Sequence, residues 1–271
     1  MITVERAGHA AIVWLDRPDK LNAMGPEFWE ELPGVMAALG ADAEVRAVVI
    51  AGRGRAFSVG LDLTAFGPAI AGGALGGGGA TPVARNRVLF EEIKRLQAAI
   101  TAVADCPKPV IAAIHGYCLG GGVDLVTACD IRLAATDAVF SVRETRLAMV
   151  ADVGTLQRLP RIVAPGKAAE MIYTGGDYPA AAALEFGLVD RVYPDAEAVH
   201  AAARDLAARI AANSPLAVQG AKAVLRAGEG RSVAEGLDYV ALWNAAMLQS
   251  ADLAEAITAY GEGRAPGYRG E

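Results

Sequence analysis

The fold is decided by residues 109–124, whose sequence is PVIAAIHGYCLGGGVD. The apolar, partly β-branched run from Val110 to Ile114 is typical of a buried strand, and the three glycines at 120–122 are typical of a tight turn that opens a helix. Asp124 then falls in the first turn of that helix, where the partial positive charge of the helix N-terminus favours an acid. The stretch therefore predicts a strand, a turn and a helix of an α/β protein, with a carboxylate at their junction.

Two further acids, Glu144 and Asp152, end segments that are otherwise apolar or glycine-rich. Packing alone rarely places carboxylates there, whereas several carboxylates in a cleft beside a glycine-rich helix start can move protons on a carbonyl compound. A structural explanation competes for each acid. Asp124 could serve as a helix charge, Glu144 as a surface acid, and Asp152 as the N-cap of a helix that begins near Gly154.

The composition of the 271-residue chain indicates one sizeable α/β core with an appended helical region. The hydrophobic fraction is 54%, the formal net charge is −6 and the sequence pI is about 5.2, so there is no electrostatic reason to bind nucleic acid. No apolar stretch reaches about 18 uninterrupted residues, and residues 1–6 show neither a secretory nor a transit pattern. We therefore expect a cytoplasmic protein with no membrane partner.

The cysteines and histidines are scattered along the chain. The thiols form an odd set without close metal-ligand spacing: Cys106, Cys118 and Cys129. A disulfide framework would be unusual in so apolar a chain, so we expect reduced, packed thiols. The histidines complete no cluster with zinc or iron spacing, and the sequence predicts no metal.

An order of strand, strand and helix recurs along the first part of the chain. We expect a hairpin within residues 2–15, a helix from Pro26 to near Leu39, a buried strand over 46–52, and later strands over 110–114, 131–135 and 188–192. A helix is expected from about Gly121. The repetition predicts a coil of strand–strand–helix units.

After Asp195 the pattern changes to long alanine-rich helical periodicity. Helices are expected over 197–212, 215–227, 232–249 and 252–262. We therefore divide the chain into a core, 1–195, that carries the site, and a helical region, 196–271. The apolar stripes of the last helices need a surface to cover them, and a neighbouring subunit can supply it, so we expect a homo-oligomer.

The segment from Gly67 to Thr81 is rich in glycine. Glycine has high backbone entropy, so the composition predicts a mobile loop. A phosphate-cradling role is disfavoured, because no lysine follows at P-loop spacing and no buried strand immediately precedes the segment.

Two glycine turns could each present a free backbone N–H to a cleft. Gly60 permits a sharp turn that leaves the N–H of Leu61 unpaired, and the turn at 120–122 presents the N–H of Gly121 at a helix N-terminus. Two converging N–H groups form an oxyanion hole, in which one donor is typically worth ~10²–10³ in rate. The alternative, left open by glycine spacing alone, is that both turns are only tight connections.

Several motifs together resemble the crotonase (enoyl-CoA hydratase/isomerase) superfamily. They are RP at 17–18, LNA at 21–23, AFSVGLDL at 56–63, PKPVIAAIHG at 107–116, GGG at 120–122 and CDIR at 129–132. The resemblance covers nearly the whole chain. It implies a spiral core of ββα turns, a C-terminal helical trimerisation region, a trimer or dimer of trimers, and an acyl-CoA substrate, with coenzyme A as part of the substrate and no separate cofactor.

The resemblance also implies a set of site residues. The thioester oxygen would be held by the N–H groups of Leu61 and Gly121. The substrate would lie along Val59, Gly60, Leu61, Asp62, Leu63 and Gly121. Hydratases of the superfamily carry two glutamates and a loop glycine, whereas this chain has Asp124, Glu144 and Asp152 at those positions.

This set of three acids, in GVDLVTACD at 122–130 and ADVGTLQRLP at 151–160, is similar to the dienoyl-CoA isomerase branch of the superfamily. The branch implies conversion of 3,5-dienoyl-CoA to 2,4-dienoyl-CoA in acyl-chain β-oxidation. One proton leaves C2 and another arrives at C6, so two separated acids are needed. We assign Glu144 as the base at C2 and Asp152 as the acid at C6, with the reverse as the alternative, and expect Asp124 to tune the pair.

Two other functions compete with this interpretation. A hydratase would add water to 2-enoyl-CoA with Asp124 and Glu144, leaving Asp152 incidental. A non-enzymatic acyl-CoA binding protein would need a pocket but not three acids. Asp130 is expected to be structural, as a cap or salt-bridge partner at a joint between helix and strand.

Overall fold

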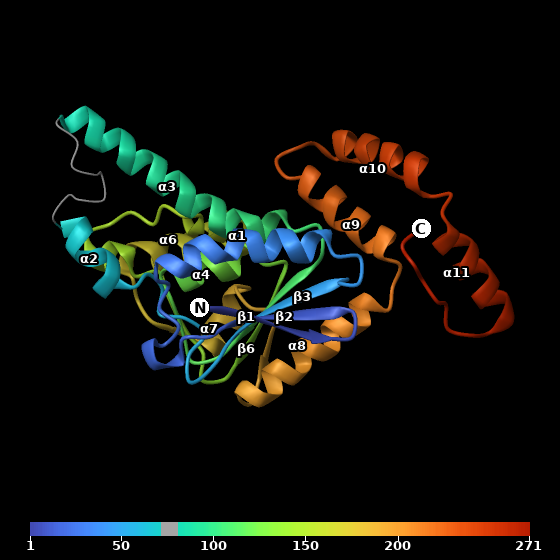
Figure 1. Ribbon diagram of the computed structural model, residues 1–271, viewed down its shortest axis with the longest axis horizontal. Coiled ribbons are helices and arrows are strands. Elements are labelled where there is room, and N and C mark those ends of the chain that lie inside the picture. The colour runs from blue at the N-terminus through green and yellow to red at the C-terminus, as the bar shows by residue number, and fades with distance from the viewer. Residues whose placement is uncertain (72–80) are drawn as a thin grey trace.

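The computed structural model describes residues 1–71 and 81–271 and shows a twisted, mostly parallel sheet between layers of helices (Figure 1). The strands of the main sheet run in the order β1-β2-β3-β4-β6-β9. Their bounds are Ile2–Ala7, Ala10–Leu15, Ala47–Gly52, Val110–Ile114, Ile131–Ala135 and Arg191–Tyr193. β1 and β2 form an antiparallel hairpin, and each later neighbour pairs in parallel. The predicted α/β class and ββα spiral are confirmed.

The central strands are apolar throughout because both faces of the sheet are covered. Along β2, Ala11, Val13 and Leu15 face one hydrophobic cluster, and the alternate residues face another. The first cluster lies under α1 (Pro26–Ala41) and α3 (Pro82–Asp105), and the second lies under α8 (Ala196–Ala211). Figure 1 shows α1 and α3 above the sheet and α8 below it.

Helix α1 shows why these segments become helices. Pro26 occupies its first position, where a missing N–H costs nothing. Its buried residues recur at helical spacing: Phe28, Trp29, Leu32, Met36 and Leu39. The apolar stripe therefore both selects the helix and attaches it to the sheet.

A smaller sheet, in the order β5-β7-β8, lies beside the first. Its strands are Tyr117–Leu119, Val139–Ser141 and Tyr178–Pro179, and the helix between them, α4 (Gly121–Thr127), is buried along its whole length. The remaining elements of the core are α2 (Leu63–Ala71), α5 (Thr155–Ile162), α6 (Pro165–Thr174), α7 (Ala180–Phe186) and the 3₁₀ turns Pro18–Lys20 and Glu144–Leu147.

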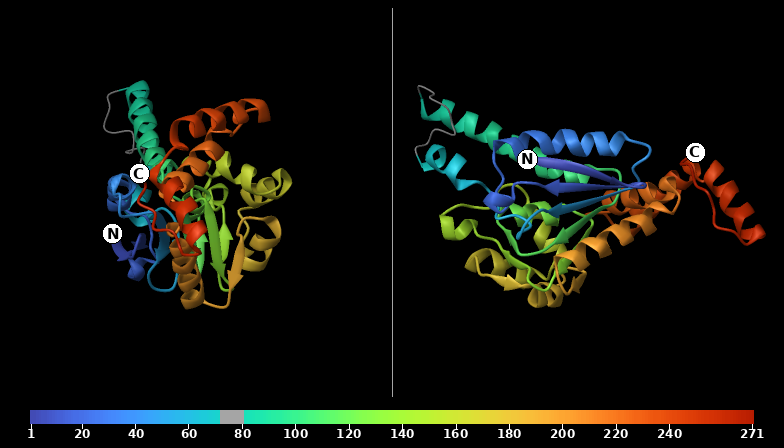
Figure 2. Two further views of the ribbon diagram at one scale, coloured as in Figure 1. Left: turned by 90° about the vertical axis from the view of Figure 1, so that its right-hand side faces the viewer. Right: turned by 60° about the horizontal axis from the view of Figure 1, so that its bottom comes forward.

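Three helices follow the core: α9 (Pro215–Ala227), α10 (Val233–Met247) and α11 (Ala251–Glu262). Figure 2 shows α10 and α11 standing away from the sheet, at the opposite end of the molecule from the projecting α3. Helix α9 is held to the core by buried Lys222, whose Nζ donates to Asp130 Oδ2 at 2.6 Å and to the carbonyl of Lys108 at 2.9 Å. Asp130 is therefore a structural partner, as predicted.

The structure corrects both ends of the predicted mobile loop, 67–81. Residues 67–71 lie in helix α2, not in a loop, and Thr81 caps α3 through its side chain. The rest of the predicted mobile loop, residues 72–80, lies outside the described residues. The boundary at 195 remains a prediction, and α8, which follows it, packs on the sheet and not among the last helices. No helix in the described ranges is both long and apolar enough to cross a membrane.

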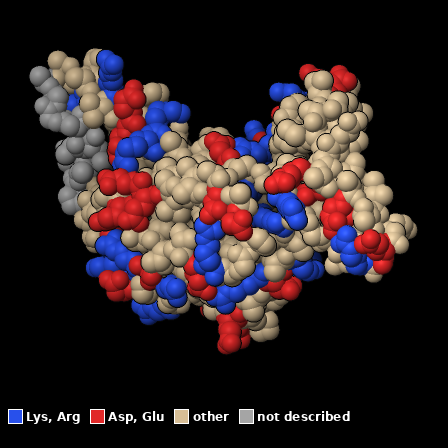
Figure 3. All heavy atoms as spheres, turned by 45° about the vertical axis from the view of Figure 1, so that its right-hand side comes forward, with Lys and Arg blue, Asp and Glu red and all other residues tan. Residues whose placement is uncertain are grey.

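The last helices leave apolar side chains uncovered in the single chain. Val233, Leu237 and Leu242 of α10 are 81%, 61% and 72% exposed, and Ile257 of α11 is 66% exposed. On the face drawn in Figure 3, charges of both signs are interspersed, while the projecting helices at upper right are largely uncharged. Several exposed apolar side chains on neighbouring helices are typical of a subunit interface.

We therefore predict that the protein is an oligomer built on α10 and α11, with a trimer as its unit. Light scattering at micromolar concentration should give a multiple of the 27.9 kDa chain mass. Leu237→Glu should shift the particle towards the monomer because it places a charge in the covered surface. Tyr173→Glu, at a side chain that is 79% exposed outside these helices, is the matched control and should leave the mass unchanged. A wild-type monomer would refute the prediction.

Candidate functional site

The two glycine turns meet at the centre of the molecule. Gly60 has a φ of +80°, and a Cβ placed on it would lie 2.6 Å from the carbonyl oxygen of Leu119 and 2.9 Å from the nitrogen of Gly121. A Cβ on Gly121 would in turn lie 3.7 Å from the nitrogen of Leu61. Only glycine permits this approach, since any side chain would force the turns apart.

The N–H groups of Leu61 and Gly121 are both left free by this geometry. Met24 donates to the carbonyl of Gly60 and accepts from the N–H of Asp62, so the intervening N–H of Leu61 faces the other way. Gly121 is the first residue of α4, whose leading N–H groups have no partner within the helix. Among the described residues neither N–H has a hydrogen-bond acceptor.

Asp124 lies in the first turn of α4 and is fully buried. Its Oδ1 accepts from the backbone N–H of Thr155 at 2.5 Å, which ties α4 to the start of α5. Within the described chain its Oδ2 has no partner. Burial, and then the charges of Glu144 and Asp152, raise the pKa of Asp124 to about 7.

Glu144 begins the 3₁₀ turn, and its carboxyl lies against the glycine turn that precedes Gly121. A Cβ on Gly120 would lie 3.2 Å from Glu144 Oε1, so this carboxyl rests against the residue directly before Gly121. Its other oxygen, Oε2, is buried without a partner in the described chain. Burial, with the charge of Asp152, raises the pKa of Glu144. Glu144 is thus half-buried against the glycine turn and is not a surface acid.

Asp152 lies on the segment that enters α5. Its backbone carbonyl accepts from the side-chain amide of Gln97 on α3 at 2.7 Å, which fixes the segment from the opposite side. The N-cap of α5 is Gly154, so Asp152 does not cap that helix. Desolvation is the leading cause that raises the pKa of Asp152, although the residue remains accessible.

The three predicted acids are therefore brought together, since Glu144 and Asp152 both act on the pKa of Asp124. The pKa of each carboxyl is shifted upward, because desolvation and neighbouring negative charges both disfavour ionisation. Such a set binds protons more tightly than ordinary carboxyls and can release and return them.

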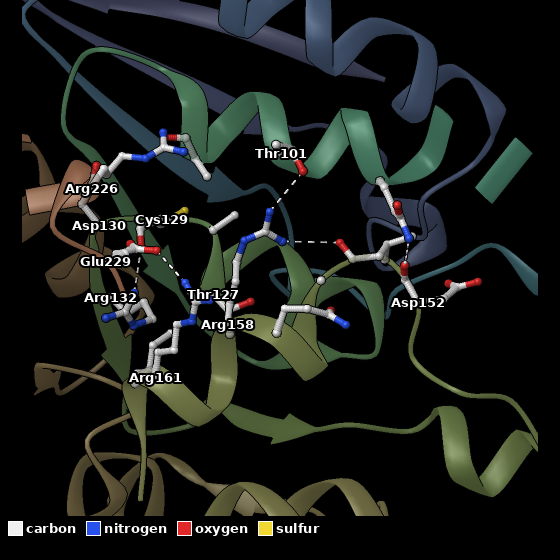
Figure 4. Close-up of a pocket in the computed structure, with 17 residues that line it drawn as sticks. Thr101, Thr127, Cys129, Asp130, Arg132, Asp152, Arg158, Arg161, Arg226 and Glu229 are labelled. Atoms are coloured by element: carbon white, nitrogen blue, oxygen red, sulfur yellow. Dashed lines mark hydrogen bonds and ion pairs between the residues drawn. The ribbon is translucent and has the colours of Figure 1, made fainter. Parts of the chain in front are cut away.

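A cavity of about 660 Å³ lies between α3, α5 and α9, and Asp152 is one of the residues that line it (Figure 4). Asp152 is at one end of it and Asp130 and Arg226 are at the other, with Arg158 extending from α5 towards Thr101. Neither Asp124, Glu144 nor Leu61 lines this cavity. It is a charged space that includes Asp152 but not the two free N–H groups.

Sequence reasoning missed the residues that hold the acids in place. Thr155 and Gln97 fix Asp124 and Asp152 through a backbone N–H and an amide. Gly154 has a φ of +137°, and a Cβ on it would lie 1.8 Å from Arg158 Nη1, so this glycine accommodates the guanidinium. Except for Gln97, the residues that hold the acids all lie in the run ADVGTLQR at 151–158. Nothing in the spacing of that run indicates what each residue contacts.

The family model for enoyl-CoA hydratase/isomerase matches residues 5–271. Proteins named Delta(3,5)-Delta(2,4)-dienoyl-CoA isomerase are 43%, 45% and 43% identical in Dictyostelium discoideum, Homo sapiens and Arabidopsis thaliana. Each alignment covers 94% of this chain and 86%, 77% and 90% of the relative. The structure of an enoyl-CoA hydratase from Bacillus anthracis superposes with a TM-score of 0.88 at 32% identity, over 100% of this chain and 99% of that one.

These relatives correct one expectation and confirm another. They are named as mitochondrial proteins in Dictyostelium and human and as peroxisomal in Arabidopsis, so the expected cytoplasmic location is wrong. Compartment addresses are short segments read by receptors, and the composition of a catalytic core does not indicate them. The fold, the family model and the relatives agree along nearly the whole chain. The chain is an enzyme of the enoyl-CoA hydratase/isomerase, or crotonase, family.

Proposed function

We propose that the protein is an acyl-CoA isomerase that converts 3,5-dienoyl-CoA to 2,4-dienoyl-CoA in acyl-chain β-oxidation. The observation that carries this proposal is a group of three interacting carboxyls with raised pKa values, one of which, Glu144, lies against the residue before the free N–H of Gly121. The relatives that bear the isomerase name support it. The substrate is the acyl-CoA, so coenzyme A arrives with it and no separate cofactor is needed.

The thioester oxygen is placed between the N–H groups of Leu61 and Gly121. Removal of a proton from C2 moves negative charge onto this oxygen, and fixed donors stabilise that charge without reorganising. Gly121 adds the positive end of the α4 backbone, which also favours an anion. The rest of the proposed binding surface is the segment that carries these donors, Val59, Gly60, Asp62 and Leu63.

Glu144 takes the proton from C2. Its carboxyl lies against Gly120, next to the Gly121 donor, and C2 is the carbon beside the carbonyl. The electrons of the broken C–H bond are delocalised in a dienolate that extends from the thioester oxygen to C6, and they become the C2–C3 double bond when C6 is protonated. A base with a raised pKa accepts this proton more readily than an ordinary carboxylate does.

Asp152 delivers a proton to C6, at the other end of the dienolate. It lies on the α5 side of the cleft, near α3, and it is exposed enough to exchange protons with water. Protonation at C6 leaves double bonds at C2 and C4 and an ionised Asp152. Glu144 then loses its proton and Asp152 regains one, which restores both carboxyls with no net change.

With a pKa of about 7, Asp124 is protonated in a large part of the molecules at neutral pH and so limits the negative charge beside Glu144. A second charge there would oppose formation of the dienolate, because like charges in a poorly solvated space repel strongly. Asp124 therefore tunes the pair and does not exchange a proton with the substrate.

Hydration of 2-enoyl-CoA is the second candidate function. The similarity to the enoyl-CoA hydratase structure favours it. So does the proximity of Asp124 to Glu144, whose charge raises the pKa of Asp124. Ultraviolet absorbance separates the two reactions. A 2,4-dienoyl thioester gains conjugation, whereas a hydrated product loses it.

The wild-type protein should convert synthetic 3,5-dienoyl-CoA with a rise in ultraviolet absorbance, faster than it hydrates crotonyl-CoA. Asp152→Asn should abolish this conversion while leaving the melting temperature and coenzyme A affinity intact, since only proton delivery is lost. Asp205→Asn, which removes an exposed charge on α8, should behave as wild type. Retention of more than about a tenth of kcat in Asp152→Asn, an effect below about 1.4 kcal/mol, would contradict a catalytic role.

Glu144→Gln should stop exchange of the C2 proton with deuterated water, because the amide cannot accept a proton. Mass spectrometry of the recovered acyl-CoA measures the exchange. Glu197→Gln, at a position in the first turn of α8, is the control and should exchange normally. If exchange at C2 persists in Glu144→Gln and disappears in Asp152→Asn, the two roles are reversed.

Asp124→Asn should stabilise the protein more at pH 8 than at pH 5.5. The pKa of Asp124 rises from 3.8 to about 7 on folding, so the folded state holds the proton more tightly and stability falls as pH increases between these values. Asparagine cannot ionise and keeps an acceptor for the Thr155 N–H. Calorimetric melting temperatures at the two pH values test this, and an equal difference between variant and wild type at both would show that Asp124 does not titrate there.

A further inference from the structure

The segment 17–24 is joined by backbone hydrogen bonds to the turn that carries the Leu61 N–H. Leu21 and Asn22 both have positive φ, 52° and 56°, which non-glycine residues rarely adopt. Such conformations are retained where surrounding contacts enforce them, and they cluster at functional sites. Here the carbonyl of Leu21 accepts from the N–H of Val59 at 3.2 Å.

Asn22 is fully buried, and both atoms of its amide are engaged. Its Nδ2 donates to the carbonyls of Arg53 and Ala56 at 2.9 and 2.8 Å, and its Oδ1 accepts from the N–H of Arg17 at 2.8 Å. The side chain thus joins the start of the segment 17–24 to both ends of the turn at 53–56. A satisfied buried network of this kind fixes one conformation.

Two sets of hydrogen bonds, which we call arms, connect this segment to Gly60 and Asp62, the residues on either side of Leu61. In the first, the Ser58 hydroxyl donates to the carbonyl of Asn22 at 2.8 Å and accepts from the N–H of Gly60 at 3.1 Å. In the second, Arg17 Nη1 donates to Asp62 Oδ2 at 2.7 Å.

Asp62 is a well-defined anchor for the second arm. It is 5% exposed, and its Oδ1 accepts from the N–H and hydroxyl of Thr64 at 3.0 and 2.5 Å. Hydrogen bonds from Thr64 and Arg17 lower its pKa to about 2, so it is ionised at neutral pH. The Arg17 guanidinium therefore pairs with an ionised Asp62 carboxylate that is largely removed from water. Charge-assisted hydrogen bonds of this kind are strong and directional.

We propose that Arg17 and Asn22 are positioning residues that aim the N–H of Leu61 at the thioester oxygen. The inference rests on the proposed function, because it assigns these residues to the donor that the isomerisation requires. Neither residue touches the reacting atoms. Their two arms hold Gly60 and Asp62, which leaves the peptide of Leu61 between two fixed points.

The test uses the absorbance of bound 2,4-hexadienoyl-CoA, a product-class ligand. Hydrogen bonds to the carbonyl oxygen polarise the conjugated thioester and shift its absorbance to longer wavelength, so the shift reports donor geometry directly. In the wild-type enzyme we expect a clear shift and turnover of the corresponding 3,5-diene. In Arg17→Met we expect a smaller shift and a loss in kcat of about tenfold or more, with ligand affinity changed less than kcat.

Arg17→Lys should recover part of both signals, because it restores the charge without the planar fork. Arg264→Met removes an exposed arginine that pairs with Glu255 at 2.6 Å near the C-terminus, and it should match wild type. Asp62→Asn combined with Arg17→Met should cost no more than the larger single change, since the two residues act through one contact.

The outcomes separate the inference from the proposed function. A wild-type enzyme with neither shift nor turnover contradicts the proposed function itself. A wild-type enzyme with both, and Arg17→Met with an undiminished shift and kcat, overturns the positioning role. If Arg17→Met does not fold, Arg17→Lys and Ser58→Ala are measured in the same way, and reduced shifts in both support the inference while wild-type values overturn it.

Discussion

The close approach of two backbone turns is the constraint on which the rest of this structure depends. The Cα of Gly60 and the first peptide of α4 are so near that a single added methyl group would contact the Leu119 carbonyl at 2.6 Å. This approach sets the two free N–H groups side by side. The segments that lead into the two turns pair in parallel at Ser58 and Cys118, and the N–H of Leu119 donates to the carbonyl of Ser58 at 3.0 Å. The pairing of these segments and the geometry of the site are therefore one arrangement.

The same approach explains why the carboxyls have unusual acidity. Helix α4 is buried along its whole length so that Gly121 can reach the Leu61 turn, and Asp124 is buried with it. A buried carboxyl binds its proton tightly unless a cation or several donors compensate, and Asp124 has one backbone donor. The acid–base character of the site thus follows from packing, which keeps water away from groups that water would otherwise ionise.

Most of the secondary structure could be predicted because the chain's local signals agree with its packing. The hairpin, α1, the apolar strands β3, β4 and β6, and the four final helices all lie within a few residues of their expected bounds. The sequence did not indicate helices α3, α6 and α7 or the small sheet, and the segment 67–71 was predicted wrongly as a loop. Residues 67–71 are helical although glycine and proline lie among them, because the Leu63–Ala71 stretch also contains good helix formers and Asp62 accepts from the N–H groups of Thr64 and Ala65 at its start. The 24-residue helix α3 contains no glycine and no proline after Pro82, so its composition also favours a helix.

The sequence by itself determined the α/β class, the order of the elements and which acids stand at their ends, because those depend on periodicity, glycine placement and residue type. It also indicated which two peptides could present free N–H groups. Only the tertiary structure decided that Asp124, Glu144 and Asp152 lie close enough for their charges to interact and that Glu144 lies beside Gly120. It also decided that Arg17 and Asn22 contact residues of the Leu61 turn from 45 and 36 positions away in the chain. Contacts between distant segments form only when the sheet is assembled, and no local pattern specifies which atoms then meet.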